Sequence, residues 1–113
     1  MNAREMEFAG WKALELASER YTLIVPLEIG LRILHCSLTG QENILFVDSA
    51  AKGQKGGPDW RLYGGHRLWF APEHMEESYE PDNDPVEWTR KEGSVRIVQK
   101  AGNRTGFAKE MEI

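Results

Sequence analysis

Cysteine is nearly absent from this sequence, which limits the kinds of site it can contain. Of its 113 residues only Cys36 carries a thiol. A disulfide within the chain is therefore impossible, and a zinc site built on several thiolates is excluded. The length is that of one domain, so we expect a single unit over residues 1–113 with an ordinary, modest hydrophobic core.

Long apolar runs and blocks of like charge are also missing. Charged residues make up 28% of the chain and the formal net charge is -4, but Lys and Arg are scattered. A scattered distribution offers no basic surface to nucleic acid. No stretch approaches the roughly 20 apolar residues of a membrane span, and Arg4, Glu5 and Lys12 interrupt the apolar run that a secretory signal needs. We expect a cytoplasmic protein with neither a nucleic-acid nor a membrane partner.

Strand-like patterning dominates the N-terminal third of the sequence. Tyr21–Val25 is rich in β-forming residues, and Leu27–Leu38 then alternates between apolar and polar or small side chains. A period of two is the pattern of a strand with one buried face. Ala13–Leu16 is predicted to form a hairpin with Tyr21–Val25. The alternative, a short helix over Arg4–Ala17, is disfavoured by a glycine within it.

The rest of the sequence continues the strand pattern. Val86–Arg90 and Val95–Gln99 flank a four-residue loop that contains glycine, which predicts a hairpin. Phe107–Ile113 alternates again, and shorter strands are predicted over Ile44–Val47 and Trp60–Tyr63. The fold class predicted from these elements is an all-β, antiparallel sandwich.

The last predicted strand reaches Ile113, where the sequence stops. A strand without a following turn or charged tail leaves a sheet edge uncovered. We therefore expect either that another chain pairs with an open edge, as in a homo-oligomer, or that the β domain is incomplete and the sequence is the front part of a longer protein.

The segment Gly64–Pro85 contains the residues best suited to a binding site. It shows no clear period, and loops longer than about 12–15 residues tend to be functional or disordered. Its aromatic residues favour an ordered loop. Flat aromatic faces suit the C–H side of a pyranose, and polar side chains suit its hydroxyls. The predicted sugar-contacting residues are His66, Arg67, Trp69 and Glu73.

These residues also have purely structural interpretations, which the sequence leaves open. Arg67 either contacts a ligand or forms an ion pair with an acidic residue of its own segment, namely Glu73, Asp82 or Asp84. The run Asp82–Asp84 lies between two prolines and is typical of a rigid turn. The three tryptophans of the region are either stacking platforms or core residues; they are Trp60, Trp69 and Trp88.

A metal centre is the weaker alternative for this segment. His66, Glu73 and His74 offer two imidazoles and a carboxylate, yet their spacing follows neither a helical nor a strand period. His35 and Cys36 are neighbours in a predicted strand, where successive side chains point to opposite faces, so they form no nucleophile pair. We predict no metal and no cofactor.

Several runs of the sequence resemble one known superfamily. Gly64–Glu73 and Pro81–Trp88 look like an uncharacterised branch of the galactose mutarotase-like (aldose 1-epimerase-like) proteins. Gly30–Ile33 and Gly40–Leu45 are similar to the opening strands of that superfamily, as is the closing Thr105–Ile113. The resemblance spans most of the chain and implies the N-terminal part of a β-supersandwich that binds a hexose in a concave sheet.

The resemblance also implies roles for individual residues. His66 and Arg67 occupy the place of an Asn-Arg pair that contacts the sugar, so Arg67 would keep the contact while His66, which replaces Asn, keeps only the position. Leu31 stands where the family often has glycine. The family's carboxylate base and main histidine acid, which epimerisation requires, lie in later segments than this sequence contains.

The expected partner is therefore a small-molecule sugar, and interconversion of aldose anomers is expected only of a complete protein. Two alternatives stay open. One is a non-catalytic β-module that acts in sugar binding or oligomer assembly, and the other is a truncated product without activity.

Overall fold

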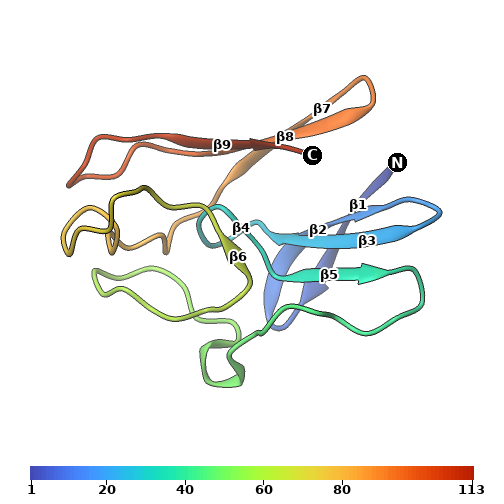
Figure 1. Ribbon diagram of the computed structural model, residues 1–113, viewed down its shortest axis with the longest axis horizontal. Coiled ribbons are helices and arrows are strands. Elements are labelled where there is room, and N and C mark those ends of the chain that lie inside the picture. Colours follow the sequence, from blue (N-terminus) through green and yellow to red (C-terminus); the bar gives the residue numbers. More distant parts are fainter.

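The computed structural model describes all 113 residues and confirms the all-β, antiparallel architecture. The strands form three sheets with the orders β1-β2-β3-β5, β4-β6 and β7-β8-β9 (Figure 1). None of the helical residues form a segment with the length and apolar character of a membrane span. The elements are β1 Asn2–Phe8, β2 Trp11–Ala17, β3 Tyr21–Pro26, β4 Arg32–Ile33, β5 His35–Leu38, the 3₁₀ turn η1 Ser49–Ala51, β6 His66–Arg67, β7 Glu87–Lys91, β8 Ser94–Gln99 and β9 Lys109–Glu112.

The N-terminal sheet begins with a tight hairpin. Ala9 and Gly10 connect β1 to β2 with φ angles of 51° and 88°. Two consecutive positive φ angles are typical of a type I′ turn, whose twist matches that of the flanking strands. The predicted pairing of β2 with β3 is confirmed, with Leu14 opposite Val25 and Leu16 opposite Leu23. The helical alternative over Arg4–Ala17 is therefore wrong.

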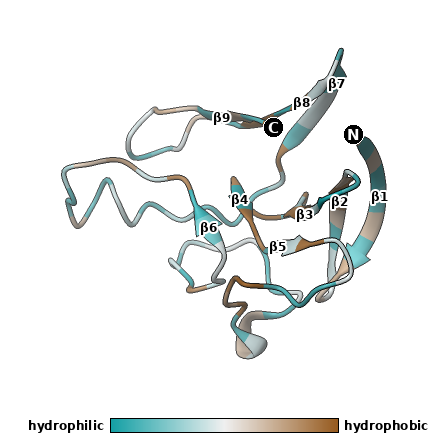
Figure 2. Cartoon of the chain, turned by 45° about the vertical axis from the view of Figure 1, so that its right-hand side comes forward, coloured by the Kyte–Doolittle hydropathy of each residue, from teal (hydrophilic) through white to brown (hydrophobic).

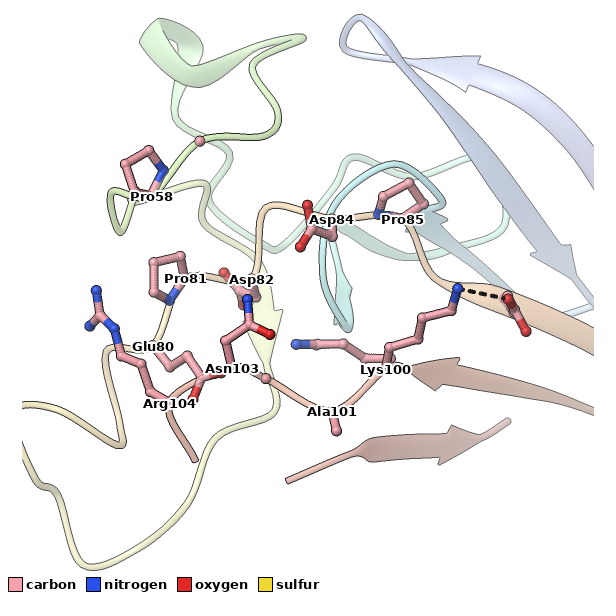
Figure 3. A pocket seen from close by; sticks show the side chains of 14 residues that line it. Pro58, Glu80, Pro81, Asp82, Asp84, Pro85, Lys100, Ala101, Asn103 and Arg104 are labelled. Atoms are coloured by element: carbon pink, nitrogen blue, oxygen red, sulfur yellow. Dashed lines mark ion pairs between the residues drawn. The ribbon is translucent and has the colours of Figure 1, made fainter. Parts of the chain in front are cut away.

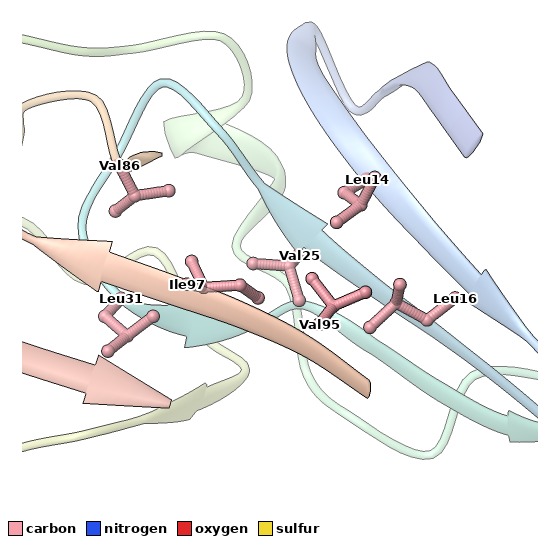
Figure 4. Packing of buried hydrophobic residues seen from close by; sticks show 7 residues of the cluster. All are labelled: Leu14, Leu16, Val25, Leu31, Val86, Val95 and Ile97. Carbon is pink, nitrogen blue, oxygen red and sulfur yellow. The ribbon is translucent and has the colours of Figure 1, made fainter. Parts of the chain in front are cut away.

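The main core lies between the N-terminal sheet and the β7-β8-β9 sheet. Figure 4 shows the side chains of Leu14, Leu16 and Val25 facing those of Val95 and Ile97 between the two layers. All five are buried. Burial of one such side chain contributes about 1.5–3 kcal/mol, so this face joins the halves of the chain into one sandwich.

The opposite face of the N-terminal sheet carries a second core. Trp11 and Tyr63 meet edge to face at 5.8 Å between ring centroids, and the Trp11 indole N–H donates to the Gln54 carbonyl oxygen at 2.8 Å. Ile29 and Leu34 complete the buried cluster. This core fixes the loops that follow β5 against the sheet.

The prediction of one strand over Leu27–Leu38 is wrong. Only Arg32–Ile33 and His35–Leu38 are strands, in two different sheets. The alternation fails because Arg32, expected on the polar face, is only 2% exposed. Its guanidinium pairs with Asp82, 50 positions later. A period within the segment cannot predict a partner that far along the chain.

The predicted strands over Ile44–Val47 and Trp60–Tyr63 are also absent; only a single bridge joins Val47 to Gly64. Ile44 is 78% exposed, although its apolar character suggested burial. The segment is held by polar contacts instead. The Asn43 side chain accepts from the Cys36 N–H at 3.0 Å and donates to the Leu34 carbonyl at 2.9 Å, which covers the outer edge of β5.

The C-terminal hairpin is confirmed with a shorter loop than expected. Strands β7 and β8 are joined by two residues, and Lys91 pairs with Ser94 across the turn. Strand β9 adds to β8. It is shorter than the predicted Phe107–Ile113, although Ile113 still exchanges two backbone hydrogen bonds with Val95, at 2.8 and 3.0 Å.

Candidate functional site

The candidate site is built around a buried carboxylate, that of Asp82. One of its oxygens accepts from Arg32 at 2.5 Å and from Arg67 at 3.2 Å. Burial lowers the pKa of the Arg32 guanidinium, and the negative charge of Asp82 opposes that shift. Arg32 and Arg67 are cross-strand partners in the β4–β6 pair. Like charges placed opposite each other are destabilising, so Asp82 is what allows both cations at this position.

Two glycines bring Arg67 to this position. Gly64 and Gly65 precede β6 with φ angles of 98° and 73°. A Cβ on Gly64 would lie 2.3 Å from the Phe46 carbonyl oxygen, and one on Gly65 would lie 2.2 Å from the Ile33 carbonyl oxygen. Only glycine permits both this conformation and this close approach. Figure 2 shows β6 as a hydrophilic segment beside hydrophobic neighbours.

An aromatic platform, formed by Trp60, Trp69 and Tyr79, surrounds the outer side of Arg67. The guanidinium carbon of Arg67 lies 5.1 Å from the Trp69 ring centroid and 5.9 Å from that of Trp60. Tyr79 meets both indoles edge-on, at centroid distances of 5.3 and 5.8 Å. Trp60 is 37% exposed and Trp69 is 46% exposed. The platform therefore presents aromatic surface to solvent.

Polar groups border this platform. The Tyr79 hydroxyl donates to the Glu73 carboxylate, and that hydrogen bond raises the pKa of Tyr79 above its ordinary value of 10.0. The Arg67 Nη2 donates to the Ser78 carbonyl at 2.7 Å. Donors, an acceptor and aromatic faces thus lie together, which is the mixture that ligand sites use.

The structure brings together three of the four predicted contact residues. Arg67 and Trp69 are in direct contact, and Glu73 joins them through Tyr79. His66 is exposed and directly precedes Arg67 in β6, so its side chain points to the opposite face of the strand. The roles of all four in binding remain predictions.

The structural interpretations of the same residues are resolved in part. Arg67 does form an ion pair, with Asp82. Asn83 is buried and accepts from the Tyr63 hydroxyl at 2.6 Å, as a rigid structural turn requires. Trp88 packs against the main core, whereas Trp60 and Trp69 keep exposed faces.

No group of three His, Cys, Asp or Glu side chains is arranged to hold a metal ion.

Tyr79 and Trp60 are the residues that sequence reasoning left out of the predicted contact set. The signal for Tyr79 was present, because it is an aromatic residue within the same irregular segment as Trp69. Its link to Glu73 depends on how the loop folds back, which the sequence pattern does not show.

No protein-family model, curated protein or solved structure matches the chain.

Proposed function

We propose that the chain is a carbohydrate-binding protein related to the aldose 1-epimerases, and that a small-molecule sugar binds on the aromatic platform beside Arg67. One observation carries the proposal: two half-exposed indoles are held in fixed orientation around an arginine. Single exposed apolar side chains are common, whereas a contiguous exposed patch marks a binding surface, and Trp60 and Trp69 both contact Tyr79. The C–H face of a pyranose is a flat, apolar surface that matches such a ring.

The polar atoms around the platform support the same ligand class. Arg67 has five N–H donors, and its bonds within the protein go to Asp82 and the Ser78 carbonyl. The Arg67 side chain is 11% exposed, so only a small part of it reaches a ligand. That part and the Glu73 carboxylate provide a donor and an acceptor for sugar hydroxyls.

The geometry favours binding over catalysis by this chain. Anomer interconversion needs a base for the anomeric hydroxyl and an acid for the ring oxygen. Glu73 accepts from the Tyr79 hydroxyl but keeps acceptor sites for a ligand, whereas His66 lies on the other face of β6 from Arg67, so His66 does not supply the acid that would act together with Glu73. Our proposal therefore assigns sugar binding to this chain and does not assign it anomer interconversion. Polarimetry of the purified chain with α-glucose and α-galactose is expected to show no mutarotation above buffer, and a rate above buffer would overturn this part.

Calorimetric titration with galactose and glucose tests the binding itself. We expect saturable binding of at least one sugar by the wild type. Loss of one aromatic face, worth about 0.5–1.5 kcal/mol, should weaken binding about two- to tenfold in Trp69→Ala. Phe46→Ala, which removes a 65% exposed ring outside the platform, should bind as the wild type does. Equal affinity of Trp69→Ala and wild type would overturn the proposal.

A further inference from the structure

A polar pocket of about 580 Å³ lies beside the aromatic platform. Its walls come from the loop at Pro58, the segment Glu80–Pro85 and the turn Gln99–Arg104 (Figure 3). The volume is within the range of about 300–1,000 Å³ that ligand pockets occupy. Its lining combines charged side chains with the apolar rings of Pro58, Pro81 and Pro85, so a ligand that fits meets both polar groups and apolar surface.

The pocket and the platform adjoin at two separate points of the chain. Pro58, in the pocket wall, is two residues from Trp60, and two residues span at most about 7 Å. Glu80, also in the wall, directly follows Tyr79, at a Cα separation of about 3.8 Å. The pocket and the platform are therefore neighbours at both points of the chain, although none of the three platform residues lines the pocket.

The walls of the pocket are held in place by contacts within the protein. The Glu80 carboxylate accepts from the Thr105 N–H at 2.9 Å, and Gly102 lies so close that an added Cβ would be 1.3 Å from the same carboxylate. At the other end Lys100 pairs with Glu87 at 3.6 Å, as the dashed line in Figure 3 marks, but both side chains are exposed and such a pair adds little rigidity. A preformed pocket loses less conformational freedom when a ligand binds.

The charges around the pocket narrow the ligand class. Four acidic residues, Glu80, Asp82, Asp84 and Glu87, line it against two basic ones, Lys100 and Arg104, and Asp82 is already paired with Arg32 and Arg67. The acidic excess disfavours phosphate or carboxylate groups on a ligand. Hydroxyl groups both donate and accept, so an uncharged polyol can bond to charged walls of either sign.

We propose that this pocket is a second sugar subsite, and that the ligand is an uncharged oligosaccharide with one ring on the platform and the next in the pocket. This inference rests on the proposed function of the platform. The second subsite specifies that the ligand has at least two sugar rings and no net charge. The platform alone specifies neither property.

Calorimetry with galactose and glucose, compared with lactose, cellobiose and maltose, tests the inference. At least one disaccharide is expected to bind at least tenfold more tightly than its component monosaccharides. Ala101→Trp, which fills the pocket from an exposed turn position, should remove that advantage without changing monosaccharide binding. Ala50→Trp, at an exposed position outside the pocket, is the matched control and should change neither affinity.

A second variant keeps the test valid if Ala101→Trp does not fold. Asn103→Ala removes a polar group of the pocket without adding volume, and should lower disaccharide affinity alone. Digalacturonate should bind more weakly than the best neutral disaccharide; tighter binding would overturn the uncharged class. Equal affinity for disaccharides and monosaccharides would overturn the second subsite and leave the platform proposal standing, whereas no binding of any sugar would overturn both.

Discussion

At the scale of single residues, Asp82 determines where Arg67 can lie. Its carboxylate neutralises two arginines that the β4–β6 register places opposite each other, while Arg67 also stacks on Trp69. Arg67 is therefore a structural residue and a candidate ligand contact at once. Removing Arg67 would disturb the ion pair as well as the site, which is why substitution of Trp69 is the cleaner test of binding.

Replacement of Asp82 is expected to destabilise the fold strongly. Asp82→Asn leaves Arg32, which is 2% exposed, without its counter-charge, and breaking a buried pair in this way costs about 3–5 kcal/mol. Urea denaturation of the variant should show this loss in the free energy of unfolding. Asp84→Asn, at an exposed position two residues on, should stay close to wild type. Similar stability of the two variants would show that the ion pair does not hold Arg32 in place.

The contact between Tyr79 and Glu73 predicts a titration. Because the hydrogen bond needs the phenol proton, the pKa of Tyr79 is raised above 10.0; the contact stabilises the fold below that pH and is lost as pH rises through the folded-state pKa. The phenolate absorbance that wild type shows and Tyr79→Phe lacks should therefore appear at a pH above the ordinary tyrosine value. Glu73→Gln should lower the pKa of Tyr79, Tyr79→Phe should remove its signal, and Glu76→Gln should change neither. If the same titration remains in Tyr79→Phe, it belongs to another tyrosine, and the contact between Tyr79 and Glu73 does not cause it.

At the scale of elements, sequence patterns located the hairpins but not the interrupted strands. The pairs β2–β3 and β7–β8 follow from local alternation and turn residues, which are properties of neighbouring positions. Leu27–Leu38 also alternates, yet its pattern is broken by the burial of Arg32 against Asp82. A pairing over 50 residues is set by tertiary structure, so no period within the segment reveals it.

The candidate site was predicted to a similar degree. The irregular, aromatic-rich segment Gly64–Pro85 was recognisable from composition, and Arg67 and Trp69 do meet. The face occupied by His66 was not predictable, because it depends on a two-residue strand that has too few positions to show alternation. The partnership of Tyr79 with Trp60 joins two separate loops and leaves no local signal.

The β1–β2 turn offers a test at the element scale. Ala9 has a φ of 51°, a conformation that costs a non-glycine residue roughly 1–2 kcal/mol and that asparagine tolerates better. Ala9→Asn should therefore raise the free energy of unfolding by about 0.5–1 kcal/mol. Gly10→Ala should lower it, since the added Cβ would lie 3.0 Å from the Gly53 Cα. Urea denaturation of both variants measures the two opposite changes; a shift of the same sign would contradict the turn.

At the scale of the whole molecule, the sandwich is joined by its core and by contacts at one edge. The Trp88 indole N–H donates to Glu5 at 3.1 Å, and Arg90 donates to the Met1 carbonyl at 2.9 Å, which ties β7 to the N-terminal strand. The loops on the far side of the molecule, left in Figure 1, include the candidate site and the polar pocket. The sandwich thus acts as a scaffold that holds the irregular loops of the candidate site, an arrangement in which loops often carry function.

The outer edge of β9 has features that oppose uncontrolled pairing. Glu110 and Glu112 pair with Arg96 and Lys91 on the same sheet. Charged side chains on an edge strand discourage association with a second edge. Homo-oligomer formation through open edges stays a prediction, and these charges would need partners of opposite sign across any such contact.

The most direct test of sugar binding at the platform is nuclear magnetic resonance of the four tryptophan indole N–H groups during a titration with galactose and lactose. Trp60 and Trp69 are in the platform, whereas the indoles of Trp11 and Trp88 are bonded to Gln54 and Glu5 within the fold. Sugar binding at the platform predicts that the Trp60 and Trp69 signals move together to saturation while the other two stay in place. Movement of the Trp11 or Trp88 signals alone, or no movement of any signal at high sugar concentration, would contradict it.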